Sequence, residues 1–183
     1  MKKVVAIVLI LCMAFSLASC SDYHTDLEDY SEDVAELMAQ EFMPKLDELD
    51  DYTGIAYLFK EYNSIFGTYS MQLIVKYDNE AFQREKTRLE TAYKYVDHPQ
   101  KFDLDEKYYT LPDAEFETNG YNFKVAQFAD TDFPKNFGMV GISESKKQIA
   151  YLWFYDWDLD YISGGSGNGI AMKEFVDRHF KLD

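Results

Sequence analysis

The sequence predicts an α+β fold, in which an antiparallel sheet built from hairpins carries helices packed mainly on one of its faces. Two observations lead to this prediction. Segments with helical spacing alternate with paired β-prone segments, in the order helix, hairpin, helix, two hairpins, helix. In addition, no strand–helix–strand alternation is present, which argues against a doubly wound nucleotide-binding fold.

The first helix is expected to begin near residue 25. The segment Thr25-Asp26-Leu27-Glu28 fits a capping box, with Thr25 at the N-cap and Glu28 bonding back to it. Pro44 is expected to end or kink this helix, because proline lacks the N–H and crowds the preceding turn. The predicted apolar face consists of Leu27, Tyr30, Val34, Leu37, Met38 and Phe42.

A hairpin and a second helix follow. Residues 55–59 form a β-prone run, and residues 69–78 alternate between apolar and polar side chains with a single interruption at Ile74. Gly67 lies between them at the expected turn. Asp78 or Asn79 is then suited to cap a helix that reaches about Tyr95.

The rest of the chain predicts two further hairpins and a last helix. Residues 114–128 read as two strands around Asn119-Gly120, the preferred dipeptide of a type I′ turn. Residues 137–142 and 148–161 are expected to pair around the turn 144–147. The last helix follows the glycine-rich segment 164–169, where Asn168 is suited to be its N-cap. Its apolar face is Met172, Phe175, Val176, His179 and Phe180. This order of elements is similar to that of small cystatin-like or NTF2-like sheets wrapped on a helix, an analogy of fold that implies no function.

The first twenty residues indicate export. Lys2 and Lys3 precede an apolar run, residues 4–17, that is short for a membrane span and typical of a secretory signal. The run ends in Leu17-Ala18-Ser19-Cys20, which resembles the lipobox of bacterial lipoproteins position by position. The resemblance covers residues 1–20 only, and the rest of the chain resembles no family that we recognise.

This resemblance implies a membrane anchor. Cleavage after residue 19 would leave Cys20 as the new N-terminus, with a diacylglyceryl group on its sulfur and an acyl chain on its amine. Two or more chains anchor a protein stably, whereas one is marginal. The chain then divides into a signal peptide (1–19), a lipidated cysteine with a short tether (20–24) and one α+β domain (25–183). The alternatives are cleavage near Ala18 with Cys20 a free thiol, and a retained membrane helix.

Cysteine usage and charge narrow the function classes. Cys12 lies in the signal segment, so the mature chain keeps one cysteine and forms no internal disulfide. The chain has 33 acidic and 18 basic residues and a net charge of −15. Such a surface repels phosphate backbones, so we expect no nucleic-acid partner, and it also disfavours electrostatic adhesion to anionic lipid. The expected location is the extracytoplasmic side of a membrane, cytoplasmic or outer.

The segment 152–161 carries the candidate site residues. If it is one strand, alternate side chains point to opposite faces. Acidic side chains then share one face and aromatic side chains share the other. The candidates are Asp156, Asp158 and Asp160 on the first face, and Trp153, Tyr155, Trp157 and Tyr161 on the second.

Three uses of these residues are open. The three aspartates start like an EF-hand calcium loop, but Tyr161 stands where glycine is needed and Gly167 where glutamate is needed. As an acid–base pair they would be about 6.6 Å apart along the strand, near glycosidase spacing, yet neighbours on one strand cannot flank a sugar. The aromatic face would be a stacking platform for glycan, a docking strip, or a core face under a helix.

No other motif indicates a chemistry. The segment 164–169 lacks the Lys-Ser/Thr of a P-loop and the spacing of a dinucleotide-binding loop, so we expect a connector. His24, His98 and His179 have no partner at metal-ligand spacing, and no G-x-S-x-G occurs. We therefore expect no cofactor and no resident metal.

The sequence thus favours a membrane-anchored, non-catalytic domain that binds a protein, a peptide or a cell-envelope glycan. Two alternatives remain open at this point: a small envelope hydrolase acting on a glycan or ester, and a binder of cations or small molecules at the Asp156–Asp160 face.

Overall fold

The computed structural model describes residues 23–62, 67–101, 109–127, 135–157, 159–163 and 170–182. The predicted signal segment with Cys20, Asp158 and the glycine-rich segment 164–169 lie outside the described residues. The α+β class and the antiparallel sheet are confirmed.

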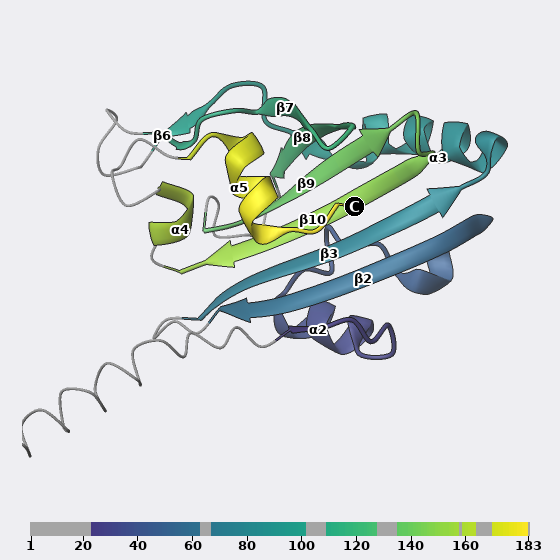
Figure 1. Cartoon of the computed structure of the whole chain (residues 1–183), viewed down its shortest axis with the longest axis horizontal. Coiled ribbons are helices and arrows are strands. Elements are labelled where there is room, and N and C mark those ends of the chain that lie inside the picture. The colour runs from purple at the N-terminus through teal and green to yellow at the C-terminus, as the bar shows by residue number, and fades with distance from the viewer. Residues whose placement is uncertain are drawn as a thin grey trace, which may run out of the picture.

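The strands of the central sheet are β1 (Tyr23–His24), β2 (Tyr52–Tyr62), β3 (Thr68–Tyr77), β4 (Lys94–Tyr95), β7 (Glu115–Thr118), β8 (Tyr121–Gln127), β9 (Asn136–Ser143) and β10 (Gln148–Asp156). Two short strands, β5 (Gln100–Lys101) and β6 (Tyr109–Leu111), pair with each other separately. The helices are α2 (Tyr30–Glu36), α3 (Asn79–Ala92), α4 (Asp160–Ser163) and α5 (Met172–His179), with a 3₁₀ turn, η1 (Leu46–Glu48). The order across the central sheet is β1-β2-β3-β10-β9-β8-β4, with β7 added on β8 (Figure 1).

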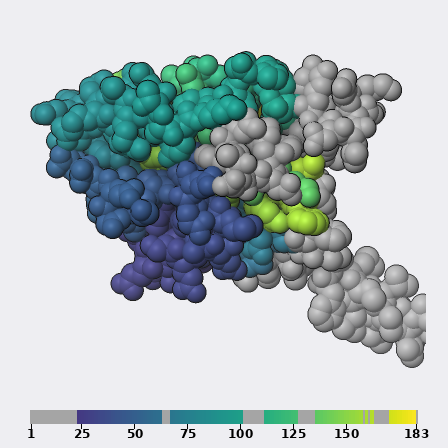
Figure 2. Space-filling model, turned by 180° about the vertical axis from the view of Figure 1, so that it is seen from behind, coloured from purple at the N-terminus to yellow at the C-terminus, as the bar shows by residue number. Residues whose placement is uncertain are grey.

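Helices cover both faces of this sheet (Figure 1). The α2 side carries α2, the segment after it and α3, which together cover the sheet when the molecule is seen from behind (Figure 2). The α5 side carries α4 and α5. Most helical residues therefore lie on one face, as predicted, but the sequence did not predict that the last helix covers the other.

The central strands are apolar on both faces because both faces are covered. In β3, Leu73 and Val75 point to the α2 side, whereas Ile74 points to the α5 side. This explains the single interruption in the alternation of that strand. In β10, Trp153 and Phe154 divide in the same way between the two sides.

The first helix is shorter than predicted. It begins at Tyr30, and Asp26 Oδ1 accepts a hydrogen bond from the Glu28 N–H, so the predicted capping box at Thr25 is wrong. It ends at Glu36 because Met38 takes a left-handed conformation with φ of 52°.

Two backbone hydrogen bonds close this end of α2 in a Schellman motif. The Ala39 N–H donates to the Val34 oxygen at 2.9 Å, and the Met38 N–H donates to the Ala35 oxygen at 3.2 Å. Glycine is the usual residue at the left-handed position, so methionine there gave no signal of a helix end. Met38 is consequently exposed instead of lying on the predicted apolar face.

Three other local predictions are confirmed. Asp78 caps α3, and its Oδ1 accepts hydrogen bonds from the N–H groups of Glu80 and Ala81, both at 2.9 Å. The turn Asn119-Gly120 has φ of 52° and 77°, as a type I′ hairpin requires. The hairpin of β2 and β3 forms around the predicted position.

The ends of the domain are fixed by contacts that the sequence did not predict. Tyr23 and His24, expected in the tether, form β1 and pair with Lys60 and Phe59 of β2. At the other end of the chain, the Gln72 side chain bonds the backbone of Lys181 twice, at 2.5 and 2.8 Å. Residues 23–24 and Lys181 are thus held to the same half of the sheet.

Candidate functional site

Trp153 lies in the core and is completely buried. The ring of Phe42 stacks on it, with centroids 5.9 Å apart, on the α2 side of the sheet. Trp153 pairs with Gly138 of the adjacent strand β9, and a Cβ at Gly138 would lie 2.6 Å from the Phe42 ring. The sequence left three roles open for the aromatic face: a stacking platform, a docking strip or a core face. Trp153 belongs to the core, because the segment after α2 covers it.

Tyr155 belongs to a row of rings at the end of the sheet. The row crosses four strands and consists of His24, Phe59, Tyr69 and Tyr155. Successive centroids are 5.0, 6.1 and 6.1 Å apart. We call these four residues the aromatic row. Tyr155 and Tyr69 are half-buried, and together with Met38 and its two predecessors they line a hollow of about 230 Å³.

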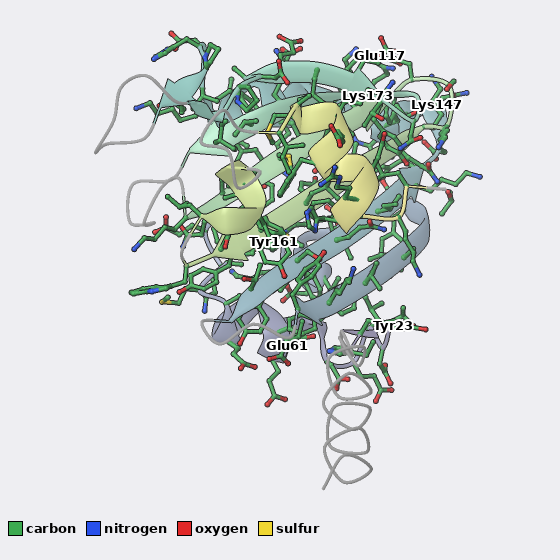
Figure 3. The ribbon with its side chains drawn as sticks, turned by 60° about the vertical axis from the view of Figure 1, so that its left-hand side comes forward. Tyr23, Glu61, Glu117, Lys147, Tyr161 and Lys173 are labelled. Carbon is green, nitrogen blue, oxygen red and sulfur yellow. The ribbon has the colours of Figure 1, made fainter. Side chains whose placement is uncertain are left out.

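The surroundings of the aromatic row are acidic. Burial raises the pKa of Tyr69, and the carboxylates of Glu61 and Glu36 raise it further. The segment 25–51, which includes α2, holds eleven of the 33 acidic residues and one lysine. Tyr23 and Glu61 both lie at this lower end of the molecule (Figure 3), whereas Lys147 and Lys173 lie at the upper end.

Trp157 is the one predicted aromatic residue with a largely open surface. It follows the end of β10 and is 48% exposed. The Lys135 Nζ lies 4.1 Å from the centre of its ring, a cation–π contact. An exposed indole beside a half-buried tyrosine is a common feature of binding surfaces, where such rings supply contact area at little entropic cost.

β10 ends at Asp156 and not at Tyr161, so the described residues after Asp156 do not continue the strand on which the predicted carboxylate face depended. Leu159 has φ of 63° and turns the chain, and Asp160 then begins α4. Asp156 is completely buried, and its Oδ2 accepts hydrogen bonds from the N–H groups of Tyr161 and Ile162 at 3.0 and 3.2 Å. Its carboxylate therefore holds α4 in place.

These bonds leave a cation or acid–base role for Asp156 without support, because the group is buried and bonded to backbone amides. Asp158 lies outside the described residues. Within the ranges that the structure describes, no group of three or more His, Cys, Asp or Glu side chains could hold a metal ion.

Tyr161 lies on the opposite side of the sheet from Tyr155. Its ring is 5.3 Å from that of Tyr62 and 5.6 Å from that of His179, centre to centre. The four aromatic residues predicted to share one face are therefore divided between the two sides of the sheet.

His179 is a buried residue that sequence reasoning did not select. Its Nδ1 lies 2.7 Å from the Tyr62 hydroxyl, and Ser70 Oγ lies 3.4 Å from the same hydroxyl. Burial, and then the charges of Lys60 and Arg178, lower the pKa of His179 to about 4, so its ring is neutral near pH 7. The available signal was its place on the apolar face of the last helix, which indicates burial but not a role.

A second buried cluster fixes β1. Asp33 of α2 is buried, and its Oδ2 accepts a hydrogen bond from the Tyr57 hydroxyl at 2.5 Å. His24 Nε2 lies 3.4 Å from the same oxygen. Burial and the bonded carboxylate raise the pKa of Tyr57, so it stays a hydrogen-bond donor. These contacts attach β1 and α2 to β2 beside the aromatic row.

With this geometry established, comparison with known proteins gives no further identification. No family model, no curated protein and no solved structure matches the chain. Among the described residues, no helix combines the length and apolar character needed to cross a membrane.

Proposed function

We propose that the chain is a lipid-anchored protein on the extracytoplasmic side of a bacterial membrane, and that its domain binds a partner protein without catalysing a reaction. The lipobox ending at Cys20 supports the anchor. Tyr23, three residues later, pairs with β2 two residues from the end of that strand. The anchor would then join the domain beside the aromatic row.

The observation that carries the binding proposal is the open aromatic surface at this end of the sheet. Trp157 and Met38 are 48% and 65% exposed, and the hollow beside Met38 is floored by Tyr69 and Tyr155. Exposed Trp, Tyr and Met side chains are enriched where proteins bind one another. Each contributes a large apolar area that is free in the isolated chain.

Charge selects the class of partner. The carboxylates of Glu36 and Glu61 lie beside this surface, and complementary charge both steers association and rejects acidic competitors. The expected partner is therefore a protein or peptide segment that presents basic residues around an apolar side chain. A neutral envelope glycan, the other ligand that the sequence left open, would leave the acidic side chains of this surface without a complementary charge.

The test is site-specific photo-crosslinking in living cells. A photo-reactive phenylalanine analogue is placed at position 38, in the hollow, or at position 52 as a matched control. Tyr52 is also exposed, at 45%, but starts β2 at the opposite end of that strand. We expect one envelope protein to be captured from position 38 and not from position 52, with less capture when Trp157→Ala is added or salt is raised.

Equal capture from both positions would contradict the proposed surface. Capture of glycan alone from position 38 would contradict the proposed partner class while leaving the surface in place.

A further inference from the structure

The α5 side of the sheet contains a hollow that the proposed partner surface does not use. It has a volume of about 260 Å³ and is lined by Tyr161, Ile170, Arg178 and His179. Figure 3 shows α4, which carries the labelled Tyr161, beside α5 on this face. The rings of Tyr62 and Phe154 lie 5.2 and 5.0 Å from that of His179, so the histidine at its wall packs among aromatic rings.

His179 presents one ring nitrogen for a ligand. The residue is 8% exposed, and its Nδ1 is held by the Tyr62 hydroxyl at 2.7 Å. A neutral imidazole that accepts from this hydroxyl carries its proton on Nε2. Among the described residues Nε2 has no hydrogen-bond partner, so in this tautomer its N–H is left at the wall of the hollow for an incoming acceptor.

The charges that face this imidazole are positive. Lys60 of β2 and Arg178 of α5 both act on His179, and Lys181 lies near enough to Lys60 to lower the pKa of its amine. The only carboxylate paired with these cations among the described residues is Glu174, which binds Arg178. In a chain of net charge −15, three basic side chains this close to one hollow are a local exception.

We propose that this hollow binds a small carboxylate with an apolar or aromatic body, whose oxygen accepts the Nε2–H of His179 and whose body packs against Tyr161 and Ile170. The Nε2–H donor and the nearby cations match the carboxylate of such a molecule. The apolar and aromatic side chains match its body. Pockets that bind small ligands combine apolar walls with a few placed polar groups in this way. The site is separate from the partner surface, and its test does not depend on the anchor.

Benzoate is the probe, and benzyl alcohol is its uncharged counterpart. At a benzoate concentration ten times its Kd, we expect the Tm of the full chain to rise by about 3 to 6 °C. His179→Phe keeps a ring of similar size, and Arg178→Gln changes an exposed side chain, so the second variant remains informative if the first fails to fold. Both should reduce the rise at least twofold, whereas Lys173→Gln, on the exposed face of α5, should not.

The proposal is supported if the Tm rise is specific to benzoate and depends on these two residues. It is overturned if benzoate has no effect up to 50 mM, if benzyl alcohol has the same effect, or if Arg178→Gln and Lys173→Gln respond alike.

Discussion

The two sides of the sheet differ most at the end where β1 enters it. On the α2 side, aromatic side chains are open to solvent and the carboxylates of Glu36 and Glu61 act on one of them, Tyr69. On the α5 side, aromatic side chains close around a neutral histidine, and the charges of Lys60 and Arg178 that act on it are positive. A single strand, β10, supplies residues to both sides by simple alternation. Whether an aromatic ring lies in the core or on the surface therefore depends on whether another segment of the chain covers it, and not on residue type alone.

The largest test of this comparison uses the two tryptophans. Trp153→Ala should lower the free energy of unfolding by about 4 kcal/mol, because it leaves a cavity under Phe42. Trp157→Ala should change it by about 0.5 kcal/mol at most, because the indole is 48% exposed. Urea denaturation measures both values. Similar losses for the two variants would mean that Trp157 is also a core residue and would remove it from the binding surface.

The second test compares Gly141 of β9, which lies under a buried ring, with Gly54 of β2, which does not. A Cβ at Gly141 would lie 2.3 Å from the Phe123 ring, on the α5 side. Because Phe123 is completely buried and cannot move aside, Gly141→Ala should cost about 3 kcal/mol. Gly54→Ala is the control, since its Cβ would meet nothing closer than 3.7 Å. If the control were equally destabilised, the loss would reflect glycine flexibility and not packing.

The third test is acid denaturation. The pKa of His179 is about 4 in the folded chain, against 6.5 for an ordinary histidine. Between these values the unfolded chain binds a proton that the folded chain does not, so stability is full above pH 6.5 and falls as the pH approaches 4. The loss should be about 3 kcal/mol at pH 4 and below.

Urea denaturation from pH 7 to pH 4 measures this loss, and His179→Phe is the reference that lacks it. Other groups also respond to acid: Glu85, for example, has a lowered pKa because of Arg88 and Tyr151, despite its burial. Parallel pH profiles for the two proteins would show that His179 titrates normally and is not buried beside cations.

The fourth test concerns Asp156. Asp156→Ala should cost about 2 kcal/mol, because two amides of α4 lose their buried acceptor. Asp156→Asn should cost less than half of that, because an amide oxygen can still accept both bonds. Added calcium should leave the Tm of the parent chain unchanged. A calcium-dependent rise in Tm that Asp156→Asn abolishes would instead support the cation site that the sequence suggested at this strand.

The smallest test is Met38→Gly. Glycine takes the left-handed conformation of Met38 without strain, so we expect the variant to be more stable by about 1 kcal/mol. Glu32→Gly, inside α2, should lower stability by about the same amount. Thermal unfolding distinguishes a gain from a loss. A loss at position 38 would mean that the Met38 side chain packs in the native chain and is not part of an open surface.

Local chemistry made much of the fold predictable. Asp78 and Asn119-Gly120 specify a helix start and a hairpin through their own hydrogen bonds and dihedral angles, and both predictions were right. The end of α2 was missed because methionine occupies a position that glycine usually marks. The end of β10 was missed because Asp156 and Leu159 fit a strand pattern as well as they fit a turn.

The candidate site was less predictable than the fold, because it depends on contacts between distant segments. Alternation placed Trp153 and Tyr155 on one side correctly, yet only the packing of Phe42 shows that Trp153 is covered. His179 meets Tyr62 across more than a hundred residues. Nothing within either segment signals that meeting, so a single sequence could not reveal it.

The proposed partner surface and the hollow beside His179 both lie near β1. The proposed anchor at Cys20 would therefore decide how each of them is placed relative to the membrane. The most direct test is mass spectrometry of the N-terminal peptide of the mature chain, isolated from membranes of a bacterium that processes lipoproteins. We predict that the peptide begins at Cys20 and carries a diacylglyceryl group on sulfur, and that Cys20→Ser releases the protein from the membrane. A peptide that begins near Ser19 with an unmodified Cys20 thiol, or one that retains the apolar segment 4–17, would contradict the account.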